Sequence, residues 1–346
     1  MSPSGGGRTG REHLTSIQEE LYEKDSEYLR GYGHACLWPL CERYRRAGET
    51  ASGATIKKET ARLEEIAGPL VTTDWLKAHL NDKNLVVIEI HSGETKIKYI
   101  DEHIPGSVFT SSVYFQENLP TETNIPYDIP SRDEFETLAR SLGINTDSKI
   151  VLVYPGFVPK DVMCATRTYW TFDYYGIANV SILDGGLGAW KRAGYAVDKV
   201  PVVPQAGNFV VASENHANYA TLDQVIEYSG KAGAVLLDSR MVSDYIGTTK
   251  QDFIPESGHI AGSVNYFAPL FLNPDLTFKK AKQIGYEMSL MGITRDKNII
   301  TYCNSGQFST TSWFALKEIA GMNKVSSFDG SVSEWVNKGK LPLIKG

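Results

Sequence analysis

The sequence has few cysteines, no long apolar run and no excess of basic charge. Its 346 residues include four cysteines, which are too few for a disulfide framework in a chain of this length. The net charge of −6 comes without a basic stripe, which argues against binding to nucleic acid. No stretch approaches the length that spans a bilayer, so we expect no membrane partner. What remains is a globular protein that can bury a core, since 42% of its residues are hydrophobic.

The N-terminus also lacks the apolar core of a signal peptide. The stretch from Met1 to Arg11 is polar and rich in Gly and Ser, which predicts that the chain stays in the cytoplasm. An altered start would instead allow a periplasmic or organellar location. A reducing environment suits the free thiols. Cys36 and Cys41 could be bridged or could bind metal, but no partnering Cys/His pair follows, so we expect no metal and no cofactor.

The length predicts two domains of ordinary size and an extension. Residues 1–66 have a charged, weakly helical pattern that glycines interrupt, which predicts a helical or partly disordered extension of unknown role. We place an N-terminal domain at 67–200, a proline-containing interdomain linker at 201–217 and a C-terminal domain at 218–346.

The two domains repeat one order of motifs. Each copy has a strand, a His-Ile-x-Gly-Ser turn, a second strand and an Asp-Gly turn, at 85–90, His103, 150–154 and Asp184 in the first copy and at 234–240, His259, 298–302 and Asp329 in the second. This agreement indicates an internal duplication of an α/β unit. Apolar, β-branched strands that alternate with short helices predict, for each copy, a mainly parallel sheet covered by helices on both faces.

Only the second copy has a cysteine at the end of its second strand. Cys303 follows the apolar run 298–302 and precedes a small-residue turn centred on Gly306, whereas the first copy has Pro155 at this point. Ligands of parallel sheets bind beyond the carboxyl ends of the strands, and loop N–H groups with a following helix N-terminus favour a thiolate there. Proline offers neither a nucleophile nor an N–H donor. The alternative is a small buried hydrophobe, which is the role that we assign to Cys164 inside a predicted helix.

Together these motifs resemble the tandem-domain rhodanese family, the thiosulfate and 3-mercaptopyruvate sulfurtransferases, over roughly residues 69–346. The resemblance implies two tandem rhodanese-like domains, of which the N-terminal copy is non-catalytic and helps to wall the site. It implies that Cys303 holds a persulfide between a small anionic sulfur donor and a thiol or cyanide acceptor. It further implies an anion-binding role for Arg240, a possible accessory role in proton transfer for His103, and a bracing role for Asp329.

Substrate-binding groups are also predicted in the loop that follows the cysteine. Its N–H groups should curl around the sulfur, its glycine permits the close approach that this needs, and its serines add hydroxyl donors. The residues assigned to this role are Asn304, Ser305, Gly306, Gln307, Phe308 and Ser309.

The choice between thiosulfate and 3-mercaptopyruvate stays open at this point. Thiosulfate-preferring members of the family usually have Arg and Lys directly after the cysteine, where this chain has Asn304 and Ser305. A second donor-binding Arg is replaced near Asp244. The lack of these cations disfavours thiosulfate as the sulfur donor. The acceptor is expected to be a small thiol, a thioredoxin-like protein or cyanide.

Two other functions would also use the loop that contains Cys303. A Cys-dependent phosphatase needs an arginine six positions after the nucleophile to grip the phosphate oxygens, and that position is Ser309. A non-catalytic sulfur-carrier or binding module of the same fold would hold a persulfide without efficient turnover. The presence of Cys303 beside the Asn-Ser-Gly turn, together with Arg240, argues against that module.

Overall fold

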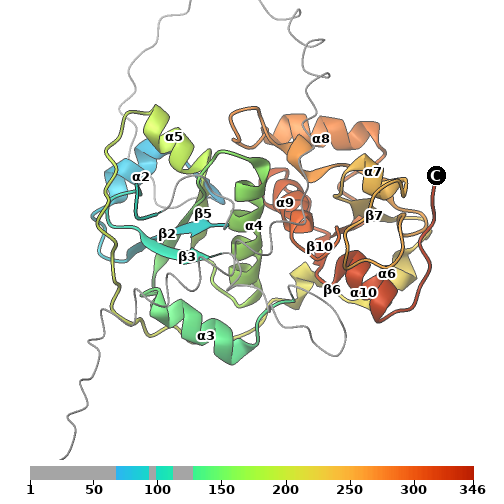
Figure 1. Ribbon diagram of the computed structural model, residues 1–346, viewed down its shortest axis with the longest axis horizontal. Coiled ribbons are helices and arrows are strands. Elements are labelled where there is room, and N and C mark those ends of the chain that lie inside the picture. Colours follow the sequence, from blue (N-terminus) through green and yellow to red (C-terminus); the bar gives the residue numbers. More distant parts are fainter. Residues whose placement is uncertain (1–67, 93–98, 112–127) are drawn as a thin grey trace, which may run out of the picture.

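The computed structural model describes residues 68–92, 99–111 and 128–346 (Figure 1). The predicted extension at 1–66, with Cys36 and Cys41, lies outside these ranges. The described chain forms two α/β units, each built on a five-stranded sheet. We call them the N-terminal half, up to residue 200, and the C-terminal half, from residue 218.

The two sheets have the same strand order, and every strand pair in them is parallel. The N-terminal sheet runs β1-β5-β4-β2-β3, with β1 (Leu70–Val71), β2 (Leu85–His91), β3 (Val108–Ser111), β4 (Lys149–Val153) and β5 (Val180–Leu183). The C-terminal sheet runs β6-β10-β9-β7-β8, with β6 (Tyr219–Ala220), β7 (Ala234–Asp238), β8 (Val264–Asn265), β9 (Asn298–Tyr302) and β10 (Val325–Phe328). The central strands β4 and β9 therefore end at equivalent places.

Helices connect these strands. In the N-terminal half they are α2 (Thr73–His79), α3 (Arg132–Ser141), α4 (Pro159–Tyr174) and α5 (Gly186–Arg192). In the C-terminal half they are α6 (Leu222–Tyr228), α7 (Val242–Tyr245), α8 (Ala281–Leu290), α9 (Phe308–Phe314), which runs on into a π-helical turn at Ala315–Ile319, and α10 (Ser331–Asn337). Thr72 and Thr221 cap α2 and α6, since each hydroxyl accepts a backbone N–H three residues further on.

Each sheet is covered on both faces, as predicted. Successive residues of a strand point to opposite faces, and the buried residues of β4 divide accordingly. Ile150 and Leu152 pack in the same core as residues of α3 and α4, whereas Val151 and Val153 pack with residues of α2 and α5. In the C-terminal sheet, Ile299 of β9 joins the core beneath α8 and α9, and its neighbour in β9 joins the core beneath α6 and α10.

One hydrophobic core spans both halves, because it contains residues of α3 and α4 together with residues of α8 and α9. Helix α4 packs against α9 at the centre of the molecule (Figure 1). These helices follow β4 and β9, so the halves meet through equivalent elements. The linker is held along the N-terminal half, where the N–H groups of Gly207 and Phe209 donate to the carbonyls of Arg140 and Ile144 at 2.8 and 3.2 Å.

The described residues contain neither a membrane-spanning helix nor a cluster of metal-binding side chains. None of the helices there is both long and apolar enough to cross a bilayer. No group of three His, Cys, Asp or Glu side chains in residues 68–92, 99–111 and 128–346 is arranged to hold a metal ion.

Candidate active site

A cavity of about 400 Å³ lies against Cys303, directly beyond the carboxyl end of β9. Both halves line it. The N-terminal half contributes the start of α4 and the residue before it, including Lys160 and Met163, so this half walls one side of the site. Cys303 is 3% exposed and is one of the residues that line the cavity. Cys164, in contrast, is buried in the core on α4.

Ser331 braces the loop from beneath. Its Oγ accepts the backbone N–H of Cys303 and that of Gly306, each at 3.0 Å. The same hydroxyl donates to the Phe328 carbonyl at 2.8 Å and lies 4.0 Å from the Cys303 Sγ. Because one hydroxyl oxygen serves both N–H groups, it ties the start of the loop to its turn. The sulfur therefore sits above a fixed backbone.

The backbone of Ser331 is left-handed, with φ +49°. The equivalent residue after the Asp-Gly turn of the N-terminal half is Gly186, with φ +57°. Glycine adopts this region without a Cβ clash, whereas a serine there is strained by about 1–2 kcal/mol. The second copy thus tolerates strain at the one position that places a hydroxyl under the cysteine, and such strain is typical of functional sites.

Gly306 permits the loop to approach Asp329 closely. Its φ is +76°, and a Cβ at this position would lie 2.3 Å from the Asp329 carbonyl oxygen. Asp329 is itself buried and forms an ion pair with Arg167 of α4. Burial raises the pKa of Asp329 to about 7, and contact with Arg167 opposes that rise. Arg167 also donates to the Gly306 carbonyl at 3.2 Å.

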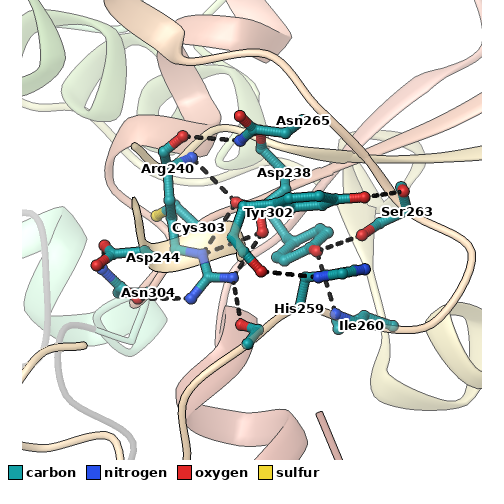
Figure 2. A network of polar contacts seen from close by, with 12 residues as sticks. Asp238, Arg240, Asp244, His259, Ile260, Ser263, Asn265, Tyr302, Cys303 and Asn304 are labelled. Atoms are coloured by element: carbon teal, nitrogen blue, oxygen red, sulfur yellow. Dashed lines mark hydrogen bonds and ion pairs between the residues drawn. The ribbon is translucent and has the colours of Figure 1, made fainter. Parts of the chain in front are cut away.

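Arg240 lines the cavity, but most of its hydrogen-bonding capacity is used by the protein (Figure 2). Nε and Nη2 contact the Asp238 carboxylate at 2.6–3.1 Å. Nη2 also donates to the Gly258 carbonyl at 2.8 Å, and Nη1 donates to Asn304 Oδ1 at 3.3 Å. Four of the five guanidinium hydrogens therefore have partners among the described residues. Its charge is paired with Asp238 and one guanidinium hydrogen remains, so the anion-binding role of Arg240 stays a prediction.

The predicted loop residues divide into two groups. Those that line the cavity are Asn304, Ser305, Gln307 and Phe308. Gly306 and Ser309 do not line it. The Gly306 N–H is taken by Ser331, and the Ser309 hydroxyl accepts from Ser327 at 2.9 Å on the side of β10. These groups are engaged within the protein, and the substrate-binding roles expected for Gly306 and Ser309 stay predictions.

His103 does not reach the cavity. It is fully buried in the N-terminal half, its ring stacks on Tyr99, and its Nδ1 donates to the Tyr99 carbonyl at 2.8 Å. His259 repeats this arrangement in the C-terminal half, with its ring on Tyr245 and its Nδ1 at 2.7 Å from the Tyr245 carbonyl. A contact that recurs in both copies belongs to the scaffold. The accessory catalytic role expected for His103 is therefore corrected to that of holding a turn.

Two residues of the site were missed by the sequence reasoning. Ser331 directly follows the predicted Asp-Gly turn at Asp329, but its left-handed backbone and its contact with Cys303 have no sequence signature. Arg167 lies on a helix of the other half, and no local motif signals its contact with the loop. The sequence signal for Arg167 is a charged residue within a largely apolar part of α4, which indicates a buried and paired side chain.

Comparison with known proteins gives the same picture along the chain. The model of the rhodanese-like domain matches residues 72–193 and again 221–338. The sulfur carrier protein TtuD of Thermus thermophilus is 33% identical over 287 residues, which cover 80% of this chain and 96% of that protein. A candidate thiosulfate sulfurtransferase of Haloferax volcanii is 29% identical over 290 residues, with the same shares covered.

Among solved structures, the anaerobic ergothioneine biosynthesis enzyme of Chlorobium limicola, in complex with trimethyl histidine, superposes with a TM-score of 0.69. The match covers 80% of this chain and 70% of that one, at 22% identity. At this level of identity the likeness concerns the fold alone.

Proposed function

The chain belongs to the rhodanese-like domain family, and from this premise we propose that it transfers a sulfane sulfur through a persulfide on Cys303. The observation that supports the proposal most is the position of this thiol. It ends the central strand of its sheet, faces a cavity walled by both halves, and rests on a loop that Ser331 braces.

The proposed reaction is a double displacement. The Cys303 thiolate attacks the outer sulfur of the donor, a bond forms between the two sulfurs, and the donor leaves with the electron pair of its own bond to that sulfur. The leaving group is sulfite from thiosulfate, or the enolate of pyruvate from 3-mercaptopyruvate, which takes up a proton. An acceptor thiolate or cyanide then attacks the terminal sulfur and releases the Cys303 thiolate.

The charges around the cavity favour 3-mercaptopyruvate over thiosulfate as donor. Thiosulfate carries two negative charges, and it would share the cavity with the Asp244 carboxylate. Lys160 and Arg240 also line the cavity, but the Arg240 guanidinium is held by Asp238. The walls are otherwise mostly apolar, as at Met163, which suits an organic donor with a single charge.

Steady-state kinetics with both donors test the function. We expect parallel double-reciprocal plots for donor and acceptor, as a ping-pong mechanism requires, and a higher kcat/KM for 3-mercaptopyruvate than for thiosulfate. Intersecting plots would contradict the double displacement. A clear preference for thiosulfate would contradict the assignment of the donor while leaving the mechanism in place.

A second candidate function is that of a sulfur carrier, which holds the persulfide for a protein acceptor. Similarity to TtuD favours it, as does an apolar rim beside the cavity. Exposed side chains adjoin cavity-lining residues on both halves, namely Phe157 and Val158 (43% and 45% exposed), Val242 (62%) and Leu270 (49%). A carrier would form the persulfide but would release its sulfur to small thiols and cyanide only slowly. Single-turnover rates with dithiothreitol and with reduced thioredoxin as acceptors separate the two functions.

A further inference from the structure

Arg167 places a positive charge from the N-terminal half against the loop of the C-terminal half. It is fully buried on α4, which packs beside α9 at the centre of the molecule (Figure 1). Its Nη1 donates to the Gly306 carbonyl and to the Asp329 carboxylate. Burying a guanidinium is unfavourable unless its charge is paired, and here the partner is the buried Asp329.

The arginine joins the Gly306 carbonyl of the loop to the Asp329 carboxylate. The Gly306 backbone lies so close to Asp329 that a Cβ on the glycine would be 2.4 Å from the carboxylate Oδ1. Arg167 Nη1 donates to both the Gly306 carbonyl and the Asp329 carboxylate, so one donor group links the loop to the turn that contains Asp329. The turn that contains Asp329 continues into Ser331, which accepts the N–H groups of Cys303 and Gly306. Gly306 is therefore held on both sides, at its N–H and at its carbonyl.

The other half of the molecule shows that the interface does not itself require this cation. Asp184, in the equivalent Asp-Gly turn, accepts the N–H of Phe278 from the opposite half at 2.9 Å. Asp329 accepts the N–H of Ile129 from its opposite half, also at 2.9 Å. Ile129 and Phe278 precede α3 and α8 by the same number of residues. The two aspartates therefore bridge the halves in the same way.

Only the side that holds the cysteine has the arginine. Counted from the strand-end tyrosines Tyr154 and Tyr302, the residue that matches Arg167 is Ala315. Among the described residues Asp184 forms no ion pair within 4 Å, whereas Asp329 forms one with Arg167. Of the two aspartates, the arginine therefore contacts only the one beside the cysteine loop, and the equivalent aspartate on the other side of the interface has no such partner among the described residues.

We infer that Arg167 is a positioning residue for sulfur transfer at Cys303. It clamps the Gly306 carbonyl to Asp329 and so keeps the loop in the shape in which the sulfur faces the cavity. The inference rests on the proposed function. It gives the N-terminal half, which has no cysteine at its own strand end, a direct part in the geometry of the reacting loop.

The test compares Arg167→Met and Arg167→Lys with Asp184→Asn, a matched change at the bridge on the other side. Each full-length variant is first checked for folding by circular dichroism and Tm. Two quantities are then measured, namely the kcat and KM for sulfur transfer and the rate at which iodoacetamide alkylates Cys303, followed on the peptide that contains it. Alkylation needs no sulfur donor, so this arm decides about Arg167 even where the wild type transfers no sulfur and the proposed function fails.

For Arg167→Met we expect kcat to fall about 10- to 100-fold with little change in KM. Displacing the nucleophile slows the chemical step more than it weakens substrate binding. The loosened loop should expose the 3%-exposed cysteine, so alkylation should become several-fold faster while turnover slows. Arg167→Lys should lie between this variant and the wild type, since an ammonium can reach one of the two oxygens but lacks the fork. Asp184→Asn should keep the wild-type values of both rates.

Three results would overturn the inference. The first is a folded Arg167→Met protein with the kcat and the alkylation rate of the wild type. The second is an Asp184→Asn protein that changes both rates as much as Arg167→Met does, which would make the effect a general loosening of the interface. The third applies where Arg167→Met fails to fold, and it is an Arg167→Lys protein with unchanged kcat and alkylation.

Discussion

The loops that follow the central strands, β4 and β9, lie at equivalent places in the two halves, but they have different hydrogen-bond partners. In the N-terminal half the Asp161 carboxylate accepts the N–H groups of Phe157 and Val158 at 2.9 and 3.2 Å. In the C-terminal half the residue at the matching distance from the strand end is Ser309, whose hydroxyl turns inwards to Ser327. The first loop thus contains its own anion, whereas the second leaves its outer side to the cavity.

Under the proposed function, one scaffold serves as a wall in one copy and as the reaction site in the other. The strands, the turn histidines and the aspartates that bridge the halves are common to both copies. Three groups around the loop differ between the copies, because Cys303 replaces a proline, Ser331 replaces a glycine, and Ser309 replaces Asp161. The following predictions test whether these replacements account for the chemistry.

The largest effect is expected from exchanging the residues at the two strand ends. Cys303→Ser should lower kcat/KM for sulfur transfer by about 1,000-fold or more, as loss of a covalent nucleophile does. Adding Pro155→Cys to this variant should restore nothing, because Asp161 already occupies the N–H groups of that loop. Kinetic assays on the single and double variants check this. Recovery of activity in the double variant would show that the position of the thiol is sufficient.

A methyl group on the loop glycine should act next most strongly. In Gly306→Ala the Cβ would meet the Asp329 carbonyl, and φ is +76°, so we expect a loss of about 2–5 kcal/mol of unfolding free energy. Sulfur transfer should fall with it. Gly156→Ala, where a Cβ would lie 2.8 Å from the Gly185 carbonyl, should destabilise the fold but leave kcat per folded molecule unchanged. Urea unfolding and activity assays on both variants distinguish loop geometry from general stability.

Making the second copy resemble the first at Ser331 should separate stability from activity. Ser331→Gly relieves about 1–2 kcal/mol of left-handed strain but removes the acceptor of two N–H groups, which costs about 1–3 kcal/mol. These effects largely offset each other, so Tm should change little. The kcat should still fall about 10- to 100-fold, because the loop loses its brace. A variant with wild-type kcat would count against the role of this hydroxyl.

The smallest effect is expected for Asp161, whose carboxylate accepts N–H groups of the loop after β4. Burial raises the pKa of Asp161, and the N–H groups of Phe157 and Val158 oppose the rise. A carboxyl with a raised pKa in the folded state contributes stability that is present below its unfolded pKa of about 3.9 and is lost as pH rises through the folded value. Asp161→Asn should therefore gain stability relative to the wild type as pH rises from about 4 to 8. Unfolding free energies at several pH values check the sign, and a constant difference would contradict it.

Much of the fold follows from local patterns in the sequence. The alternating apolar segments that predict strands at 85–90 and 150–154 correspond to β2 and β4 within a residue or two. The helix predicted around Cys164 is α4, and it begins at Pro159, which is well suited to a first helical turn. The repeat also supports these predictions, because a motif order that occurs twice is stronger evidence for an element than a single occurrence.

The parts of the site that could not be predicted depend on long-range contacts. Arg240 looked free to bind an anion, but its guanidinium also donates to the Gly258 carbonyl, 18 residues further along the chain, at 2.8 Å. Ser309 looked like a loop donor, but the first turn of α9 directs its hydroxyl towards β10. Arg167 meets Gly306 only because α4 and α9 pack together across the two halves. Such contacts arise from tertiary packing, which residue type and spacing do not encode.

The central claim is that Cys303 holds the transferred sulfur. Intact-mass spectrometry of the full chain, after incubation with 3-mercaptopyruvate or thiosulfate and removal of the donor, measures this directly, and peptide mapping locates the adduct. The account predicts a gain of one sulfur, about 32 Da for a single persulfide, on the peptide that contains Cys303 in the wild type and in Cys164→Ala. It predicts no gain in Cys303→Ser. A gain that persists in Cys303→Ser, or a wild type that takes up no sulfur from either donor, would contradict the claim.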